Sequence, residues 1–287
     1  MLTYVNYRTP AEFDVGYENF IDAPVIERWE KYFRGESAKA LALPHAEFAY
    51  DPAERNRIDV FPAPNAKPDA PILIAIHGGL WFLFDKWLMH FLAPAFTAAG
   101  VHVACPNYRL APTASLDDIV ADCRRAIAYV HKERQQAGLG SGPLFVTGHS
   151  AAGQLAAVMA STNWSAFDAR LPPDLIKGLV GVSGFYDIEP FIHTRFQPQV
   201  KFAADAYRRW SPDNLVHPGM PPALLVTGAN ESGLLHEMME GYASRLRHFG
   251  VAVDSYDAAG EDHFSVLSRL GDPSSEVHRL ALRLIQS

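Results

Sequence analysis

A serine stands at the junction of two segments that differ in character. Leu144-Phe145-Val146 is a short apolar run typical of a buried parallel strand, and the Ala-rich residues 154–161 favour a helix. Between them lies Gly148-His149-Ser150-Ala151-Ala152, in which small residues flank Ser150. A serine on such a tight strand-to-helix turn is typical of a nucleophile at the first turn of a helix. The same pattern fits a serine that only caps the helix, so the rest of the chain must decide.

The pattern around Ser150 departs from the usual form at one position. Strand-to-helix nucleophile turns follow G-x-S-x-G, and this chain has Ala152 where the second glycine stands, with Gly153 one residue later. That position needs a small residue because strand and helix pack closely there, and alanine adds only one methyl group. Ser150 therefore remains the candidate nucleophile.

A serine nucleophile needs a base and an acid that orients the base. Glu231 follows one expected strand, and His263 lies on the loop between the last expected strand and a helix. The resulting order of serine, acid and histidine is the one that accompanies a strand-to-helix nucleophile turn. Asp254 and Asp257 are the alternative acids, because they lie on or beside the last expected strand. Glu231 also fits a simpler role as an acid near a helix N-terminus.

An anionic intermediate at Ser150 needs backbone N–H donors directed at one point. The amide of Ala151 follows the serine directly and is the first candidate. A second strand, Ile72–Ile76, leads into the glycine pair Gly78 and Gly79, where the backbone can approach a substrate with no side chain in the way. We expect the oxyanion hole to be formed by this loop, with Gly79 and Leu80 as the main donors beside Ala151.

Several aromatic and histidine side chains fall close to these motifs. His149 adjoins Ser150, and it must point away from the serine hydroxyl at such a turn. We expect four residues to line a substrate pocket, namely Trp81, His149, Phe185 and Tyr186. The aromatic members of this set fit a packed hydrophobic core equally well.

Strands and helices must alternate along the chain to position these residues. Continuous apolar runs predict central strands, and glycines end the helices between them. The alternation predicts an α/β fold with a mostly parallel sheet and helices on both faces, in one domain over residues 1–287. Residues 46–50 and 56–61 predict half-buried antiparallel strands. Residues 1–45 are an expected N-terminal extension or lid with an amphipathic helix near residues 25–34, and residues 184–218 an expected insertion near the active site.

The composition is that of an ordinary globular protein, with 287 residues, 48% hydrophobic and 20% charged. A net charge of −7 argues against a nucleic-acid partner. The histidines and cysteines show no metal-binding spacing, so we expect no metal and no cofactor. No leader peptide and no membrane-spanning apolar run is visible, so we expect a cytoplasmic protein without a membrane partner. The sequence leaves a homodimer open.

Five short motifs together resemble the esterase/lipase branch of the α/β-hydrolases, and most of all its kynurenine formamidase (arylformamidase) branch. They are His77-Gly-Gly-Leu-Trp81, Asn107-Tyr-Arg-Leu-Ala-Pro112, Gly148-His-Ser-Ala-Ala-Gly153, Ser183-Gly-Phe-Tyr-Asp187 and Asp262-His263-Phe264. The resemblance runs from about residue 46 to the end of the chain. It implies the α/β-hydrolase fold, Ser150 as nucleophile, His263 as base and Glu231 at the acid position, where many members have aspartate.

The resemblance also implies a reaction. We expect a serine hydrolase that cleaves a small acyl ester or amide bond through an acyl-enzyme and resembles the arylformamidases. A general carboxylesterase for short-chain esters is the alternative reading. A non-catalytic, ligand-binding member of the fold is a more distant one, because serine, acid and histidine are all present in the right order.

Overall fold

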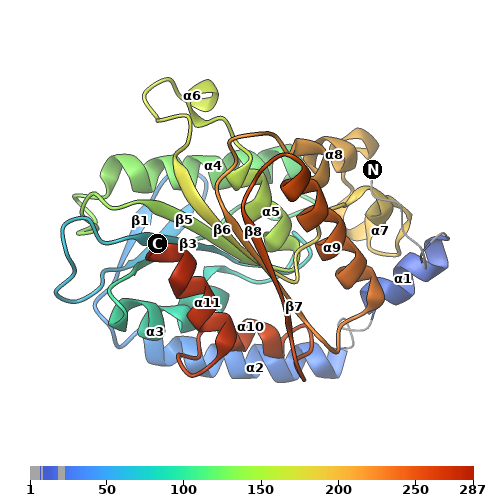
Figure 1. Cartoon of the computed structure of the whole chain (residues 1–287), viewed down its shortest axis with the longest axis horizontal. Helices are drawn as coiled ribbons and strands as arrows, with labels where there is room; N and C mark the ends of the chain where they lie inside the picture. The colour runs from blue at the N-terminus through green and yellow to red at the C-terminus, as the bar shows by residue number, and fades with distance from the viewer. Residues whose placement is uncertain (1–6, 8, 19–22) are drawn as a thin grey trace.

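A central sheet organises the computed structural model, which describes residues 7, 9–18 and 23–287 (Figure 1). Within these residues the sheet has eight strands in the order β1-β2-β4-β3-β5-β6-β7-β8. The strands are β1 (Ala46–Ala49), β2 (Arg57–Phe61), β3 (Ile72–Ile76), β4 (His102–Pro106), β5 (Leu144–His149), β6 (Ile176–Val182), β7 (Ala223–Gly228) and β8 (Val253–Ala258). β2 pairs antiparallel with β1 and β4, and the remaining pairs are parallel. The mostly parallel sheet expected from the sequence is therefore confirmed.

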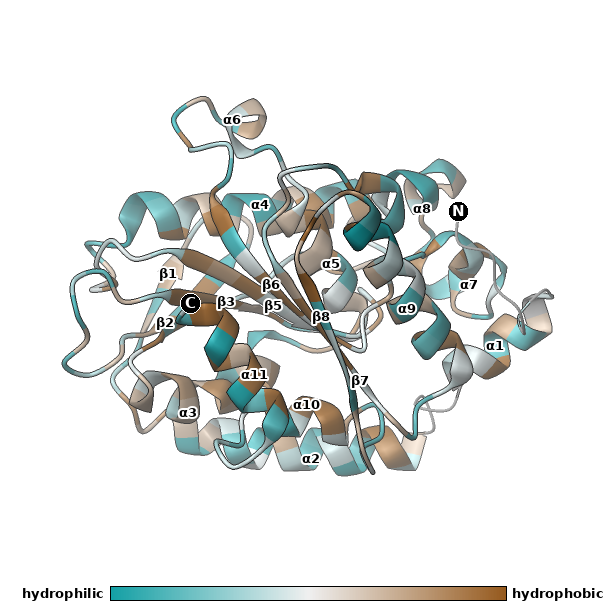
Figure 2. Cartoon of the chain, in the orientation of Figure 1, coloured by the Kyte–Doolittle hydropathy of each residue, from teal (hydrophilic) through white to brown (hydrophobic). Residues whose placement is uncertain are grey.

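Helices cover both faces of this sheet (Figure 1). One face carries α4 (Leu116–Glu133), α5 (Ala151–Ala160), α8 (Ala204–Trp210) and α9 (Gly233–His248). The other face carries α2 (Ala23–Ala40), the 3-10 helix η1 (Lys86–Leu92), α3 (Ala93–Ala98), α10 (Ser265–Leu270) and α11 (Glu276–Ile285). Two hydrophobic cores result, one on each side of the sheet. Figure 2 shows the central strands β3 and β5 as largely apolar, whereas the helices carry hydrophilic residues on their outward faces.

The two antiparallel strands differ from each other in burial. β1 is mostly exposed, whereas β2 is buried from Ile58 to Phe61, so the expectation of a half-buried strand is wrong for β2. The buried polar residue of this strand, Asp59, is accordingly paired inside the protein. Its carboxylate accepts a hydrogen bond from Nζ of Lys86 at 2.6 Å and lies 2.8 Å from Nε2 of His90. Helix η1 thereby covers the face of β2 that the sequence pattern had assigned to solvent.

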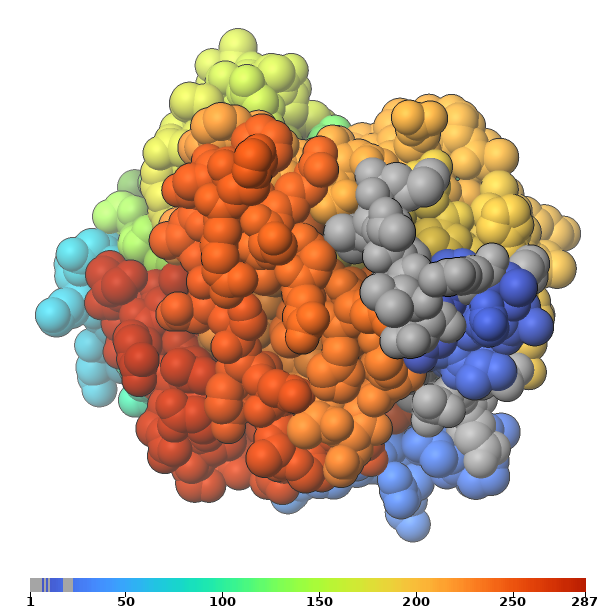
Figure 3. Space-filling view, turned by 45° about the vertical axis from the view of Figure 1, so that its right-hand side comes forward, coloured from blue at the N-terminus to red at the C-terminus, as the bar shows by residue number. Residues whose placement is uncertain are grey.

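The described part of the N-terminal segment contains two helices. The amphipathic helix expected near residues 25–34 is longer in the structure, where it spans α2, and α1 (Pro10–Glu18) was not expected. α1 lies beside the 184–218 segment and α9 (Figure 3). The amide of Arg195 donates to Oδ1 of Asp14 at 2.8 Å across this contact.

The 184–218 segment, the expected insertion, consists of short helical pieces. They are η2 (Glu189–His193), α7 (Gln197–Val200), α8 and η3 (Pro212–Leu215). A further short helix, α6 (Trp164–Phe167), stands out from the molecule after α5 (Figure 1). Among the described residues, no helix combines the length and the apolar character needed to cross a membrane.

Candidate active site

Ser150 occupies the sharp turn between β5 and α5. Its backbone has φ 60° and ψ −127°, a conformation that non-glycine residues rarely adopt and that is held by its surroundings. The Ser150 amide donates to the carbonyl of Val182 at 3.0 Å, and its own carbonyl accepts from the amide of Gly153 at 2.8 Å. Close packing here also demands a glycine at 148, since a Cβ on Gly148 would lie 2.0 Å from the carbonyl oxygen of Ala152. The local structure is therefore a strained turn that presents the serine at the start of a helix.

His263 and Glu231 form a buried pair. Nδ1 of His263 lies 2.7 Å from Oε2 of Glu231, and the two side chains are 4% and 0% exposed. A carboxylate only accepts hydrogen bonds, so Nδ1 carries the proton and Nε2 is the nitrogen that can take one up. The second carboxylate oxygen accepts from the amide of Gly228 at 2.7 Å and from Oγ of Ser183 at 2.5 Å. With both oxygens engaged, Glu231 holds the imidazole in one orientation.

The alternative acids from the sequence lie elsewhere. Asp254 and Asp257 are both exposed on β8. Oδ1 of Asp257 lies 3.3 Å from Nε2 of His236, a histidine on α9. Of the three carboxylates considered, the structure brings only Glu231 to His263.

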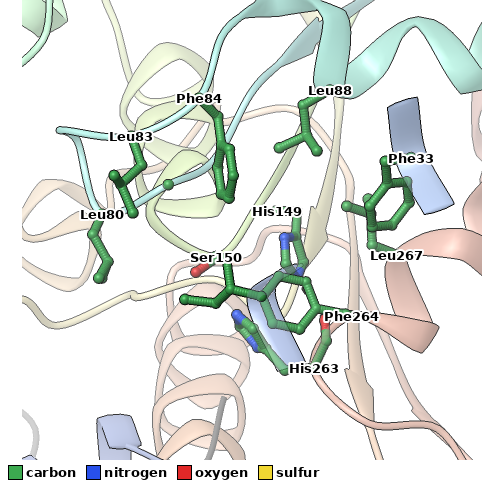
Figure 4. Close-up of a pocket in the computed structure, with 12 residues that line it drawn as sticks. Phe33, Leu80, Leu83, Phe84, Leu88, His149, Ser150, His263, Phe264 and Leu267 are labelled. Carbon is green, nitrogen blue, oxygen red and sulfur yellow. Dashed lines mark hydrogen bonds between the residues drawn. The ribbon is translucent and has the colours of Figure 1, made fainter. Parts of the chain in front are cut away.

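Ser150, His149 and His263 face one cavity (Figure 4). The cavity holds about 460 Å³ of space between atoms, part of it open to solvent. Apart from these three residues and Gly79, the described lining is apolar. α2 contributes Ile26 and Phe33, and the segment that begins α10 contributes Phe264 and Leu267. A small and largely apolar ligand group fits these walls.

The loop after β3 forms another wall of this cavity and carries the expected oxyanion donors. Gly79 and Leu80 both line the cavity, and both have positive φ, 111° and 50°. The Gly79 carbonyl accepts from the amides of Phe82 and Leu83 at 3.0 and 2.8 Å. Because C=O and N–H point in opposite directions across a trans peptide, this turns the amide of Leu80 away from the loop interior. Among the described residues, nothing accepts a hydrogen bond from the amides of Gly79 and Leu80.

The other two expected oxyanion residues lie close by but do not line the cavity. Ala151 begins α5, where the first amides of a helix have no partner within the helix. Gly78 packs against the backbone of the strand-to-helix turn at Ser150, and its carbonyl lies 2.9 Å from Nδ1 of its neighbour His77. Burial lowers the pKa of His77 to about 4, against the opposing effect of this hydrogen bond, so His77 is neutral at pH 7.

The four residues expected to line a pocket separate into two groups. His149 lines the cavity, whereas Trp81, Phe185 and Tyr186 are packed in the core on the other side of the loop. Nε1 of Trp81 donates to Oε1 of the buried Gln154 at 3.0 Å, which ties the loop after β3 to α5. Tyr186 stacks on Tyr242 with ring centroids 4.5 Å apart. These three aromatic residues belong to the hydrophobic core and do not line the cavity.

Several residues of the site were not anticipated from the sequence. Ser183 bonds Glu231 from the end of β6, and the cavity walls come from Phe33, Phe84 and Phe264 together with leucines. Phe264 directly follows His263, and Phe33 lies on the predicted amphipathic helix, so adjacency and helical periodicity could have indicated these two. Ser183 begins one of the five motifs, but that motif did not indicate its bond to Glu231, which depends on how β6 and β7 pair.

No metal centre is evident in the described part of the chain, where no group of three or more histidine, cysteine, aspartate or glutamate side chains is placed to hold an ion. The described residues at the cavity offer a hydroxyl and two imidazoles, with backbone amides that can donate hydrogen bonds to an anion.

A strand-to-helix serine on a mostly parallel, eight-stranded sheet with helices on both faces defines the α/β-hydrolase fold. The BD-FAE family profile matches residues 58–238. The chain is 30% identical over 255 residues to "Kynurenine formamidase" of Danio rerio, covering 87% of this chain and 85% of that protein. The chain therefore belongs to the BD-FAE family of α/β-hydrolases, close to the kynurenine formamidases, and it is a hydrolase.

Two further comparisons agree with this placement. The chain is 26% identical over 239 residues to "Esterase LipQ" of Mycobacterium tuberculosis (strain ATCC 25618 / H37Rv), covering 76% of this chain and 56% of that protein. Among solved structures, the Pyrobaculum calidifontis esterase superposes with a TM-score of 0.73 at 24% identity, covering 92% of each chain. The latter similarity shows the shared fold.

Proposed function

We propose that the protein is a serine hydrolase that cleaves small N-aryl formamides. The observation that carries this proposal is the buried pair of Glu231 and His263 at the cavity that Ser150 also lines. Ser150 is the nucleophile, His263 the base, and Glu231 the acid that orients the base. The relationship to a kynurenine formamidase supports a formamide rather than another amide as the substrate.

The reaction runs in two halves. Oγ of Ser150 attacks the formyl carbon while Nε2 of His263 takes the hydroxyl proton, and the amides of Gly79, Leu80 and Ala151 hold the oxyanion. The C–N bond then breaks, the imidazolium returns its proton to the nitrogen, and the arylamine leaves. Water attacks the formyl-enzyme with His263 again as the base, which releases formate and restores Ser150.

The shape of the site supports an aryl leaving group. Formyl is the smallest acyl group, so most of the apolar cavity remains for the other side of the scissile bond. Phe33, Phe84 and Phe264 present aromatic surface there, and an arylamine buries apolar area against such walls. α2 acts as the cover of the site, since Ile26 and Phe33 come from it. The 184–218 segment supports the site indirectly, because the Trp210 carbonyl accepts from Nε2 of Gln154 at 2.9 Å.

A comparison of wild type and Ser150→Ala tests this function. Wild type should release formate and aniline from formanilide and should be labelled covalently by a fluorophosphonate. Ser150→Ala should lose labelling and roughly 10⁴-fold or more of kcat while its melting temperature stays close to that of wild type. Near-wild-type turnover by the folded Ser150→Ala protein would exclude Ser150 as the nucleophile.

A short-chain carboxylesterase is the second candidate, because the chain is also related to Esterase LipQ. The same residues would act, with an alcohol as the leaving group in place of an amine. Parallel assays with formanilide and p-nitrophenyl acetate separate the two activities. A kcat/KM for the ester that exceeds the formamide value by orders of magnitude would favour the esterase.

A further inference from the structure

The imidazole of His149 has one nitrogen atom, Nδ1, that takes no part in the proposed mechanism. Nε2 of His149 lies 2.7 Å from the carbonyl oxygen of His263, and a carbonyl can only accept, so Nε2 carries the ring proton. Nδ1 is then the unprotonated nitrogen with a lone pair. No described residue bonds to this Nδ1, and His149 lines the cavity (Figure 4). His149 thus offers a hydrogen-bond acceptor in a cavity with apolar walls.

The imidazole of His149 stays in this neutral form at ordinary pH. Burial lowers the pKa of His149 well below its usual value, and the nearby His263 lowers it further, while the bond to the His263 carbonyl opposes both effects. A protonated ring would turn Nδ1 into a donor. The neutral ring keeps Nδ1 as an acceptor under the conditions in which His263 acts as a base.

His149 lies on the side of the site where the leaving group must depart. The leaving atom receives its proton from His263, so it must come within hydrogen-bonding distance of that imidazole. The ring of His149 is 4.4 Å from the ring of His263, centroid to centroid. An acceptor on His149 is therefore on the His263 side of the cavity, within reach of the leaving atom, whereas Gly79 and Leu80 form another wall.

Amide and ester substrates differ at this leaving atom. The nitrogen of an aryl formamide carries a hydrogen, whereas the bridging oxygen of an aryl formate carries none. As the nitrogen lone pair turns toward His263 to take up a proton, its N–H turns away and needs another acceptor. If this N–H stays unpaired in the apolar cavity, the rate of amide hydrolysis falls roughly 10-fold or more.

We propose that Nδ1 of His149 accepts the N–H of the scissile amide and so favours N–H-bearing formamides over the matching esters. This inference rests on the proposed function, and it makes His149 a specificity-determining residue of that site. His149 also holds the backbone of His263 through Nε2, so the two nitrogens have separate roles that can be separated by substitution.

The test measures kcat/KM for formanilide and for phenyl formate in two variants. His149→Gln places an amide nitrogen where Nε2 lies and no acceptor where Nδ1 lies. His149→Asn places an oxygen near Nδ1 and removes the donor to His263. Both variants should be slower on both substrates, but the formanilide to phenyl formate ratio should fall roughly 10-fold or more only in His149→Gln. An unchanged ratio in a folded His149→Gln protein, labelled by fluorophosphonate, overturns the inference.

A substrate comparison in wild type needs no variant. N-methylformanilide has the same scissile bond and no N–H, so wild type should prefer formanilide by roughly 10-fold or more. Equal rates would contradict the role of His149 and leave the serine mechanism intact.

A wild type that hydrolyses only esters likewise overturns the inference but not the triad. Absence of both turnover and fluorophosphonate labelling overturns the proposed function itself, and the inference with it.

Discussion

Glu231 accepts hydrogen bonds from three donors, and this number predicts the effect of neutralising it. Nδ1 of His263, the amide of Gly228 and the hydroxyl of Ser183 share its two oxygens. Glutamine has one acceptor oxygen and an NH₂ group that donates, so Glu231→Gln sets at least one donor against another. The imidazolium also loses its counter-charge. We expect kcat for formanilide to fall roughly 10³-fold or more.

Asp257→Asn is the matched control for this change. Asp257 is the exposed carboxylate 3.3 Å from His236, and its neutralisation should leave kcat within about 2-fold of wild type, as for most surface substitutions. Steady-state kinetics on both proteins decide the matter. If Asp257→Asn were the more damaging variant, Glu231 would be only a buried structural acid.

The sequence was sufficient to predict that Glu231 lies beside His263 and that Ser150 lies at the same cavity as this histidine, but not which residues surround them. Ser150, Glu231 and His263 follow expected strands, and parallel strands bring their carboxyl ends to one edge of a sheet. Trp81 illustrates the limit. An aromatic side chain beside a glycine pair fits a pocket wall and a core position equally well, and only the buried partner Gln154 shows that Trp81 belongs to the core.

The loop after β3 depends on Gly79 for its shape. This residue has φ 111°, and a Cβ there would lie 2.5 Å from the carbonyl oxygen of Leu83. Gly79→Ala must therefore move the backbone that carries the expected oxyanion donors. We expect kcat to fall roughly 10²-fold or more, the effect of losing one such donor, as measured with formanilide.

Gly100→Ala provides the control for backbone strain alone. Gly100 also has positive φ, 80°, and a Cβ there meets nothing within 4 Å. This variant should lose about 1 kcal/mol of unfolding free energy and keep its kcat. Equal kinetic effects of the two alanines would show that the loop geometry at Gly79 has no special role.

Helix α2 supplies a wall of the cavity, which predicts control of substrate size. Ile26 lines the cavity and is only half-buried, so it can be changed at modest cost to folding. Ile26→Ala should raise kcat/KM for a naphthyl formamide relative to formanilide, and Ile26→Trp should lower that ratio. Val25→Ala, at a half-buried neighbour that does not line the cavity, is the control and should leave the ratio unchanged.

The success of the predicted elements depended on how local their signals are. β3 has the predicted bounds, because a run of five apolar residues between turn-forming residues is typical of a central strand. β5 extends beyond its apolar run to His149, since its pairing with β6 continues up to the turn at Ser150. β2 was misjudged because its alternating pattern could not reveal that η1 provides Lys86 and His90 to pair with Asp59.

Buried neutral histidines predict how the stability of the folded protein responds to acid. The pKa of His77 is about 4 in the folded protein against an ordinary 6.5, so the unfolded chain takes up this proton first. The contribution of His77 to stability is present above pH 6.5 and is lost as the pH falls toward 4, by about 3 kcal/mol in total. His149 acts in the same direction.

Urea unfolding of wild type and His77→Phe at several pH values tests this linkage. Phenylalanine keeps a ring against Tyr108, on which His77 stacks with centroids 4.2 Å apart, and it does not titrate. The unfolding free energy of the variant should decline less steeply than that of wild type between pH 6.5 and 4. Parallel declines would assign the acid sensitivity to other groups.

The location of α2 has a consequence for the divergence of related proteins. The BD-FAE match covers residues 58–238, so it includes the turn at Ser150 and the glycine loop but neither α2 nor His263. Because α2 lines the cavity but carries none of Ser150, Glu231 and His263, changes in α2 can alter which molecules enter without moving these three residues. Related chains that differ in α2 can thus differ in substrate range while they keep Ser150, Glu231 and His263.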